Sequence, residues 1–297
     1  MLKHRLVFGV GIIAPTLILG VIYLPSAALL AALVAVSTVA ILEFYRVLDG
    51  AKIPAFRFVG AAAGAVIMLA TYAGFRWNPG EPHAVSMARA HEWEMTALVC
   101  AVIVLMIRQF PQKNNSQPLP TIACTLLGVL YVPLLMNFFM KLALLPCDIH
   151  WSAPLTGKPG MYLVLYVLLS AKLTDAGALF VGMAIGKHKL FPRLSPSKTW
   201  EGFLGGICAG AIVSLIFFRF VGSERLGGLS VPPFHAAVLG VILAVAGMTG
   251  DLTESLLKRA SQSKDSGNLV PGIGGMLDMA DSLLFVAPVF YFYVRLN

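Results

Sequence analysis

The chain has little charge. Asp, Glu, Lys and Arg make up only 12% of its 297 residues, whereas 58% are hydrophobic. Soluble domains carry about 25% charged residues, so this composition excludes an ordinary soluble globular protein. The sequence also lacks a polar domain of any size and a low-complexity tail. These absences predict a chain that is dissolved in lipid rather than in water.

Residues and motifs typical of several enzyme classes are scarce as well. The four cysteines form no CxxC pair, which favours small buried apolar residues over a disulfide or a metal site. The six histidines show no ligand spacing, and only His188 lies in a charged segment. The motifs GxxxxGK(S/T), GxSxG and HExxH are absent, and no Ser/His/Asp constellation is evident. Any chemistry must therefore rest on other groups.

Apolar runs of membrane-spanning length, about 20 residues, fill most of the chain. We place them at 6–24, 27–47, 56–75, 95–110, 119–141, 160–185, 202–219, 233–250 and 282–296. They predict an all-α, polytopic membrane bundle of about nine transmembrane helices. The first run has the basic start of a signal peptide, but further spans follow at once, so we expect an uncleaved first helix.

Lys and Arg residues are distributed unequally over the predicted loops. With the N-terminus in the cytoplasm, the cytoplasmic loops receive about twice as many of the 22 Lys and Arg residues as the opposite loops. This predicts a cytoplasmic N-terminus. Two polar segments, 186–202 and 251–281, then both emerge in the cytoplasm because two spans separate them.

The first polar segment, "GKHKLFPRLSPSKTWEG", is rich in cations. A basic loop of this kind can simply contact anionic lipid or fix the orientation of the chain. The second segment is different because it gathers acids. Five of the 14 acidic residues of the chain lie in it: Asp251, Glu254, Asp265, Asp278 and Asp281. Membrane anchoring does not require carboxylates, so this segment points to a function.

The spacing of the acids suggests metal-assisted phosphate chemistry. If 250–259 is helical, Asp251, Glu254 and Lys258 share one face. Asp251 then lies near a helix C-terminus, where negative charge is disfavoured, so a functional role is expected. Mg²⁺ is typically held by carboxylates together with substrate phosphates, and cations and glycine-rich backbone N–H groups suit phosphate. The cations available for this are Lys187, Lys189, Lys198, Lys258, Arg259 and Lys264.

Residues 255–281 closely resemble the signature of the phosphatidate cytidylyltransferases (CDP-diacylglycerol synthases). That pattern reads S-x-x-K-R, four residues, K-D-x-G, then P-G-H-G-G-x-x-D-R-x-D. The residues in register are Ser255, Lys258, Arg259, Lys264, Asp265, Gly267, Pro271, Gly272, Gly274, Gly275, Asp278 and Asp281. Upstream, "DAGALFVG", "GKHKL" and "SPSKTWEG" are similar to the family's D-T-G-A-Y, G-K-H-K-L and S-P-K-K-T-W-E-G. The motifs span 172–282, and the N-terminal part agrees only as a set of spans.

The resemblance implies an intramembrane reaction in which CTP and phosphatidic acid give CDP-diacylglycerol and pyrophosphate, with no nucleic-acid partner. It implies Mg²⁺ held by Asp251 and Asp278, with a second, monovalent cation as a further candidate. The implied catalytic residues are Asp251, Lys258, Arg259, Lys264, Asp265, Asp278 and Asp281. The implied substrate-binding residues are Lys172, Asp175, Lys187, Lys189, Ser195, Lys198, Thr199, Gly272, Gly274 and Gly275.

The same resemblance implies a setting for the reaction. We expect a bacterial cytoplasmic (inner) membrane, a polar funnel that opens to the cytoplasm, and a homodimer as the candidate assembly. The chain then divides into N-terminal transmembrane helices (1–118) and a C-terminal catalytic region (119–297).

The sequence departs from the family pattern at three positions. Ile273 replaces a histidine, Met279 replaces an arginine and Ser197 replaces a lysine. Lys172 is a candidate substitute for the missing arginine, although it can also simply pair with Asp175 three residues on.

Three alternatives remain open at this point. A CTP-dependent polyprenol or phytol kinase would share the architecture but not the long motif, and an inactive paralogue would fit the departures. A transporter or channel would need ionisable groups along several spans, and the predicted spans carry few.

Overall fold

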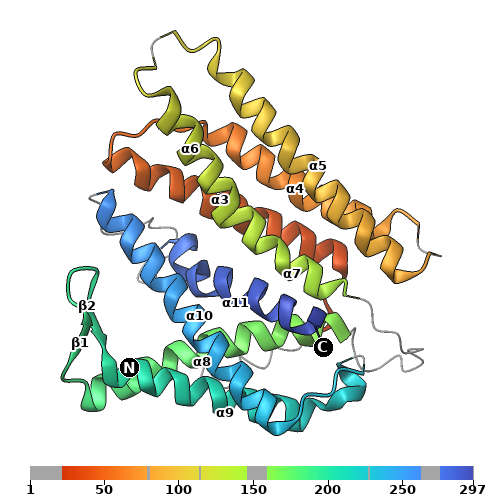
Figure 1. Cartoon of the computed structure of the whole chain (residues 1–297), viewed down its shortest axis with the longest axis vertical. Helices are drawn as coiled ribbons and strands as arrows, with labels where there is room; N and C mark the ends of the chain where they lie inside the picture. Colours follow the sequence, from red (N-terminus) through yellow and green to blue (C-terminus); the bar gives the residue numbers. More distant parts are fainter. Residues whose placement is uncertain are drawn as a thin grey trace.

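The computed structural model describes residues 22–78, 81–113, 115–145, 159–226, 228–261 and 275–296. These residues form a bundle of long helices with one small hairpin (Figure 1). The helices are α3 (Ser26–Gly50), α4 (Arg57–Arg76), α5 (His83–Gln109), α6 (Pro118–Val129), α7 (Leu135–Ala143), α8 (Pro159–Ile185), α9 (Trp200–Arg225), α10 (Pro233–Ala260) and α11 (Met276–Leu296). A π-helical turn, η2 (Leu130–Leu134), joins α6 to α7, and Pro133 lies within it.

Eight segments of the described chain are helical, long and apolar enough to cross a membrane, with α6, η2 and α7 counted as one crossing. The expected polytopic helical bundle is therefore confirmed. The predicted span 6–24 lies almost entirely outside the described residues. Each of the other eight predicted spans corresponds to one of these segments.

The predicted starts of two spans are wrong. Helix α5 begins at His83 rather than at 95, and α11 begins at Met276 rather than at 282. Both helices start with turns that carry ionisable residues, such as Glu94 and Asp278, which lower the local hydropathy. The structure accommodates these residues because partners from other helices contact them.

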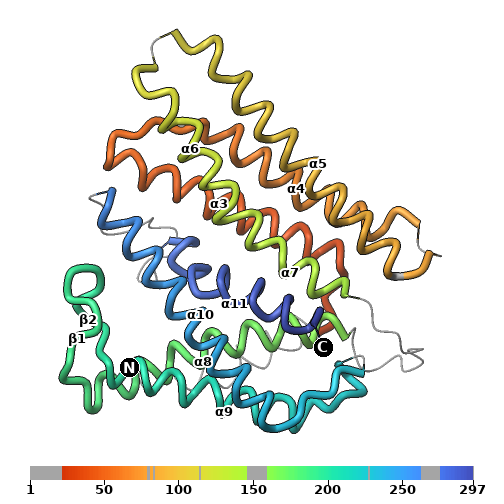
Figure 2. Tube along the Cα trace, viewed as in Figure 1, coloured from red at the N-terminus to blue at the C-terminus, as the bar shows by residue number. Residues whose placement is uncertain are grey.

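The helices form two groups that pack against each other. Helices α3 to α7 lie together in the upper part of Figure 1, and α8 to α11 lie below them. The trace in Figure 2 shows α11 at the border of its group with the first group, and α11 contacts α3, α7, α8 and α10. The predicted division at residue 118 stays a prediction: α6 packs on α3, α4 and α5, whereas α7 also contacts α8 and α11.

Small residues allow the helices around the site to approach closely. A Cβ atom added to Gly177 on α8 would lie 2.4 Å from the Cβ atom of Ala209 on α9. On the other side of α9, a Cβ atom at Gly240 of α10 would lie 2.4 Å from the carbonyl oxygen of Gly210. Close backbone packing of this kind replaces the hydrophobic effect as the source of helix association in lipid. It holds α8, α9 and α10 as one unit.

The polar segment 186–202 forms an antiparallel hairpin, which the all-α expectation missed. Strand β1 (Lys189–Phe191) pairs with β2 (Ser195–Thr199), with Lys189 opposite Thr199 and Phe191 opposite Ser195. Helix α9 starts directly after β2, and the Thr199 hydroxyl accepts a hydrogen bond from the Gly202 N–H (3.1 Å), which is an N-cap contact. The two strands of the hairpin are too short and too polar to show the alternation of apolar and polar residues by which a half-buried strand is predicted.

The ends of successive helices alternate between two faces of the bundle. The face at which α3, α5, α8 and α10 end, and at which α4, α6, α9 and α11 begin, is here called the site face. At this face the end of α3 touches the end of α10, since a Cβ atom at Gly50 would lie 2.1 Å from the Ser261 carbonyl oxygen. The hairpin belongs to the same face.

Candidate active site

A cavity of about 460 Å³ lies between α8, β2, α9, α10 and α11 near the site face. One part of its lining is charged and the other part is apolar. The charged lining residues are Lys172, Asp175, Lys198, Asp251, Asp278 and Asp281. Apolar lining residues include Leu179, Met183, Leu190, Phe203, Met248 and Leu252. Four of the sequence-predicted acids and two predicted lysines thus line one cavity, although they come from four elements.

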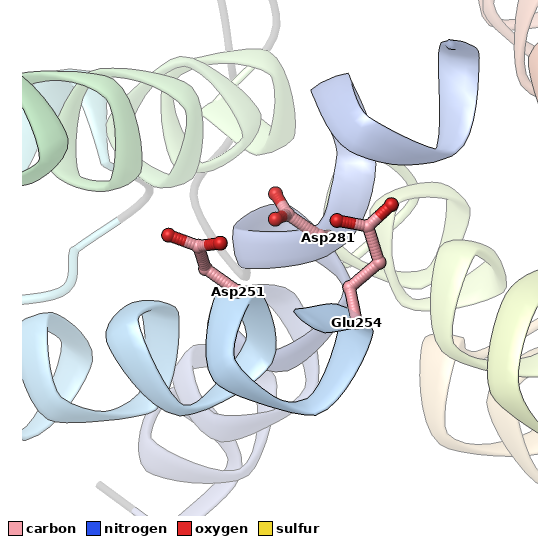
Figure 3. A group of neighbouring side chains, drawn as sticks. All are labelled: Asp251, Glu254 and Asp281. Atoms are coloured by element: carbon pink, nitrogen blue, oxygen red, sulfur yellow. The ribbon is translucent and has the colours of Figure 1, made fainter. Parts of the chain in front are cut away.

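Three carboxylates meet beside this cavity. Oxygen atoms of Asp251 and Glu254 on α10 and of Asp281 on α11 lie within 4.8 Å of one another (Figure 3). Glu254 and Asp281 are 2% and 6% exposed, and Glu254 Oε1 has no hydrogen-bond partner. Carboxylates this close repel each other unless a cation or a proton lies between them. The donor set therefore fits a hard divalent cation such as Mg²⁺.

Asp278 has a different environment. Its Oδ1 atom accepts a hydrogen bond from Lys258 Nζ (2.8 Å), and its Oδ2 atom accepts one from the Gly275 N–H (2.9 Å). The second contact is the return bond of a capping box, so Asp278 also closes the first turn of α11. Lys258 Nζ in turn contacts Glu254 Oε2 at 2.9 Å. The predicted metal pair of Asp251 and Asp278 stays a prediction, and the geometry adds Glu254 and Asp281 as candidates.

Two lysines bring positive charge to the acids. Lys198, on β2, forms an ion pair with Asp251. Lys172, on α8, donates from Nζ to the Met279 carbonyl oxygen (2.9 Å) on α11. Lys172 and Asp278 both line the cavity, as the proposed substitution of Lys172 for an arginine requires. The described residues show no Lys172–Asp175 ion pair; the Asp175 carboxylate accepts a hydrogen bond from the Ser282 hydroxyl (3.3 Å) instead.

Other predicted residues lie outside the cavity lining. Lys187 and Lys189 are exposed, and Ser195 is partly exposed on the hairpin. The Arg259 side chain donates to the Leu194 carbonyl oxygen (3.4 Å), which ties α10 to the hairpin. Four predicted residues, Lys264, Asp265, Gly272 and Gly274, lie outside the described residues.

Residues that sequence reasoning did not select also shape the site. Glu254 was recognised only as a neighbour of Asp251 on one helix face, yet its carboxylate joins the acid cluster. Glu43 on α3 is 1% exposed and accepts a hydrogen bond from the Leu277 N–H (2.9 Å) at the start of α11. A lone glutamate inside an apolar run was the only signal for Glu43, because its partner is 234 residues away.

Fold and site together define a polytopic helical membrane protein with a cavity of carboxylates and lysines at one end of the bundle. Residues 3–297 match the model of the Cytidylyltransferase family. The chain belongs to this family.

Relatives with established names agree with this assignment. The chain is 34% identical to the phosphatidate cytidylyltransferase of Bacillus subtilis over 203 residues, which are 68% of this chain and 69% of that one. It is 33% identical to the Staphylococcus haemolyticus phosphatidate cytidylyltransferase over 66% of this chain and 67% of that one. Identity reaches 43% with the Haemophilus influenzae phosphatidate cytidylyltransferase, over 45% of this chain and 46% of that one.

Proposed function

We propose that this protein is a phosphatidate cytidylyltransferase, a CTP-dependent nucleotidyltransferase of phospholipid biosynthesis. It transfers CMP from CTP to phosphatidic acid and releases CDP-diacylglycerol and pyrophosphate. The observation that carries this proposal is the cavity, in which carboxylates and lysines adjoin an apolar lining within a membrane-spanning bundle. The family and the names of the relatives point to the same reaction.

The two parts of the cavity suit the two substrates. Lys172 and Lys198 offer positive charge to phosphate groups in the charged part. On the apolar side, Leu179 and Met183 are 59% and 67% exposed, so this part of the cavity adjoins the lipid-facing surface of α8. A lipid can thus present its phosphate to the charged part while its acyl chains stay in the bilayer.

A divalent cation, Mg²⁺ in the first place, would be held by Asp251, Glu254 and Asp281, with Asp278 as the further predicted ligand. Such an ion supplies neutralisation of phosphate charge and polarisation of the reacting phosphoryl group. We propose the same cluster of acids as the binding site for a second, monovalent cation.

The remaining task of the protein is to position two anions. A phosphate oxygen of phosphatidic acid forms a bond to the α-phosphorus of CTP, and the bond from that phosphorus to the β-phosphate oxygen breaks. A phosphomonoester has a second pKa of about 6, so the nucleophile is already ionised at neutral pH and needs no general base. In keeping with this, no histidine lies among the described residues of the cavity lining. Lys198 and Lys172 are placed to offset the charge of the departing pyrophosphate.

For the cellular setting, we propose the inner membrane of a bacterium, with the site face toward the cytoplasm, where CTP is available. The excess of Lys and Arg in the loops of that face supports this orientation. A homodimer is proposed as the assembly.

The decisive experiment uses purified protein, phosphatidic acid, Mg²⁺ and CTP labelled with ³²P at either the α or the γ position. The proposal expects label in the extracted lipid from α-labelled CTP only, with γ label recovered as pyrophosphate. Lipid labelled from γ-labelled CTP, given an alcohol acceptor, would identify a kinase instead. An absence of label in both cases would identify an inactive paralogue.

A further inference from the structure

A second cavity, of about 610 Å³, lies at the site face between the α3–α4 connection and the α5–α6 connection. It shares no lining residue with the catalytic cavity. Its lining includes Asp49, Lys52, Phe56, Arg108, Asn115 and Gln117. We propose that this cavity binds the phosphate group of an anionic phospholipid, apart from the site of the reaction.

The charge of the cavity suits an anion. Among the described residues of the lining, Asp49 is the one carboxylate, and it already forms an ion pair with Arg57. The two cations of the lining, Lys52 and Arg108, are exposed. The Arg108 guanidinium lies 5.4 Å from the centre of the Phe56 ring, and its two terminal NH groups donate to the side-chain oxygen of Gln112, a further lining residue. A phosphate that binds the planar fork in bidentate fashion would replace this amide oxygen as the acceptor.

The left-handed backbone conformation of Lys52 suggests a functional role for its side chain. Lys52 has φ of 55° and is the one non-glycine residue with a positive φ in the described part of the chain. It follows the end of α3, where its N–H donates to the Asp49 carbonyl oxygen (2.9 Å) and the Ile53 N–H donates to that of Leu48 (3.2 Å). Glycine is the usual residue in this left-handed C-terminal position. A lysine here has a less favourable backbone conformation than a glycine would have, but it supplies a cation to the cavity lining.

The walls of the cavity are held in place without a ligand. Asn115 donates to the Thr121 hydroxyl (2.8 Å) and accepts from the Gln117 N–H (2.9 Å). The Phe56 N–H donates to the Thr125 hydroxyl (3.0 Å), which fixes the α3–α4 connection against α6. A preformed site loses less conformational freedom when it binds.

Apolar residues beside the cavity favour a lipid over free phosphate. Phe58, Phe110 and Leu119 are 84%, 82% and 75% exposed, and each follows the lining residues closely in sequence. They lie at the ends of membrane spans, where an exposed apolar side chain meets acyl chains. A phosphate site with a hydrocarbon surface next to it matches the chemistry of a glycerophospholipid.

The test measures binding to the full-length protein in an uncharged detergent. The probes are dihexanoyl phosphatidylglycerol, dihexanoyl phosphatidylcholine and inorganic phosphate, and binding is measured by titration calorimetry. Wild-type protein should bind the anionic lipid at least tenfold more tightly than the zwitterionic one. Lys52→Gln and Arg108→Gln should each weaken that binding about tenfold. The control, Lys113→Gln, removes an exposed charge of the same face outside the cavity lining and should change it less than twofold.

A second variant separates lost binding from damaged folding. Lys52→Gly removes the ammonium and also relieves the left-handed backbone, so it should raise the melting temperature while it weakens lipid binding. Unchanged lipid binding in this variant would overturn the proposal, as would an equal loss in Lys113→Gln. Binding of inorganic phosphate as tight as that of the anionic lipid would overturn the assignment to a lipid.

Discussion

At the scale of single residues, Lys172 is the candidate substitute for the arginine that Met279 replaces in the family motif. Its ammonium group lies on the Met279 carbonyl oxygen, next to Asp278 and Asp281 in the cavity lining. The Met279 side chain is 39% exposed and does not line the cavity. The cation beside the Met279 backbone therefore comes from α8 rather than from the side chain at position 279 of α11.

We expect Lys172→Met to lower kcat/KM for CTP at least tenfold, because it removes a cation from the transition state. Adding Met279→Arg should restore part of the loss, since it returns a cation to the position at which the family motif carries an arginine. Steady-state kinetics in detergent with both substrates measure this. The control is Lys113→Met, which should stay within twofold of wild type. A Lys172→Met variant with full activity would return this lysine to a structural role.

A second prediction at this scale concerns the cation. Asp281→Asn and Glu254→Gln should each weaken binding of Mn²⁺, followed by electron paramagnetic resonance without substrate, at least tenfold, because each removes charge from the carboxylate cluster. Asp278→Asn should abolish turnover, to below a tenth of the wild-type rate at saturating Mg²⁺. If Asp278→Asn weakens Mn²⁺ binding more than Asp281→Asn does, the ion lies with Asp251 and Asp278, as the motif alone implies.

At the scale of elements, the hairpin and the helix packing decide how the site is built. The hairpin positions Lys198 beside Asp251 on α10, and Thr199 caps α9 directly after the hairpin.

We expect Lys198→Ala to raise KM for CTP at least tenfold while the melting temperature shifts little. Lys189→Ala, an exposed position on the neighbouring strand, should have a much smaller effect. Equal effects of the two would mean that the hairpin contributes only general positive charge.

The contact between α8 and α9 gives a prediction about packing. Gly177→Ala should lower the melting temperature and the activity, because the new methyl group would meet the Cβ atom of Ala209 at 2.4 Å. Overpacking of this kind typically costs about 1–3 kcal/mol. The double variant Gly177→Ala/Ala209→Gly exchanges the two side chains and should recover most of the loss. Failure of the exchange would mean that another neighbour of Gly177 limits the packing.

The sequence predicted the positions of the helices better than the contacts between them. Hydropathy located the helices because lipid demands long apolar runs, and helical spacing placed Asp251, Glu254 and Lys258 on one face of α10, as observed. It set the start of α5 too late because Glu94 looks costly in a span until its partner on α7 is known. The sequence could not predict the hydrogen bond of Lys172 to the Met279 carbonyl oxygen or that of Glu43 to the Leu277 N–H. Both contacts join helices that are far apart in sequence.

At the scale of the whole molecule, a second group of polar side chains is buried among α4, α5 and α7. Lys141 Nζ and Glu94 Oε2 are 2.6 Å apart, and both residues are buried. Asn137 donates to Glu94 Oε1 (3.0 Å) and to the Thr71 hydroxyl (2.7 Å). His91, close to Glu94, contacts the Tyr291 hydroxyl on α11 (3.2 Å). This network links the first helix group to the helix that carries Asp278 and Asp281.

We expect Lys141→Met to lower the melting temperature in detergent strongly, because it leaves the Glu94 carboxylate buried without its lysine partner. Breaking a buried pair in this way costs about 3–5 kcal/mol. The double variant Lys141→Met/Glu94→Gln removes both charges and should be more stable than the single variant. If the double variant is the less stable of the two, the network does not depend on that ion pair.

The Glu43–Leu277 hydrogen bond has a consequence for how such an enzyme can be divided. The recognisable motifs all lie in the C-terminal half, which invites the view that this half is a transferable module and the rest an anchor. Yet a carboxylate of α3 holds the N–H of the residue that directly precedes Asp278. A gene fragment that encodes only the motif-bearing half would thus leave the first turn of α11 without this acceptor. Gene fusion or recombination at the junction between the halves would have to preserve one glutamate in a region where little else resembles a motif.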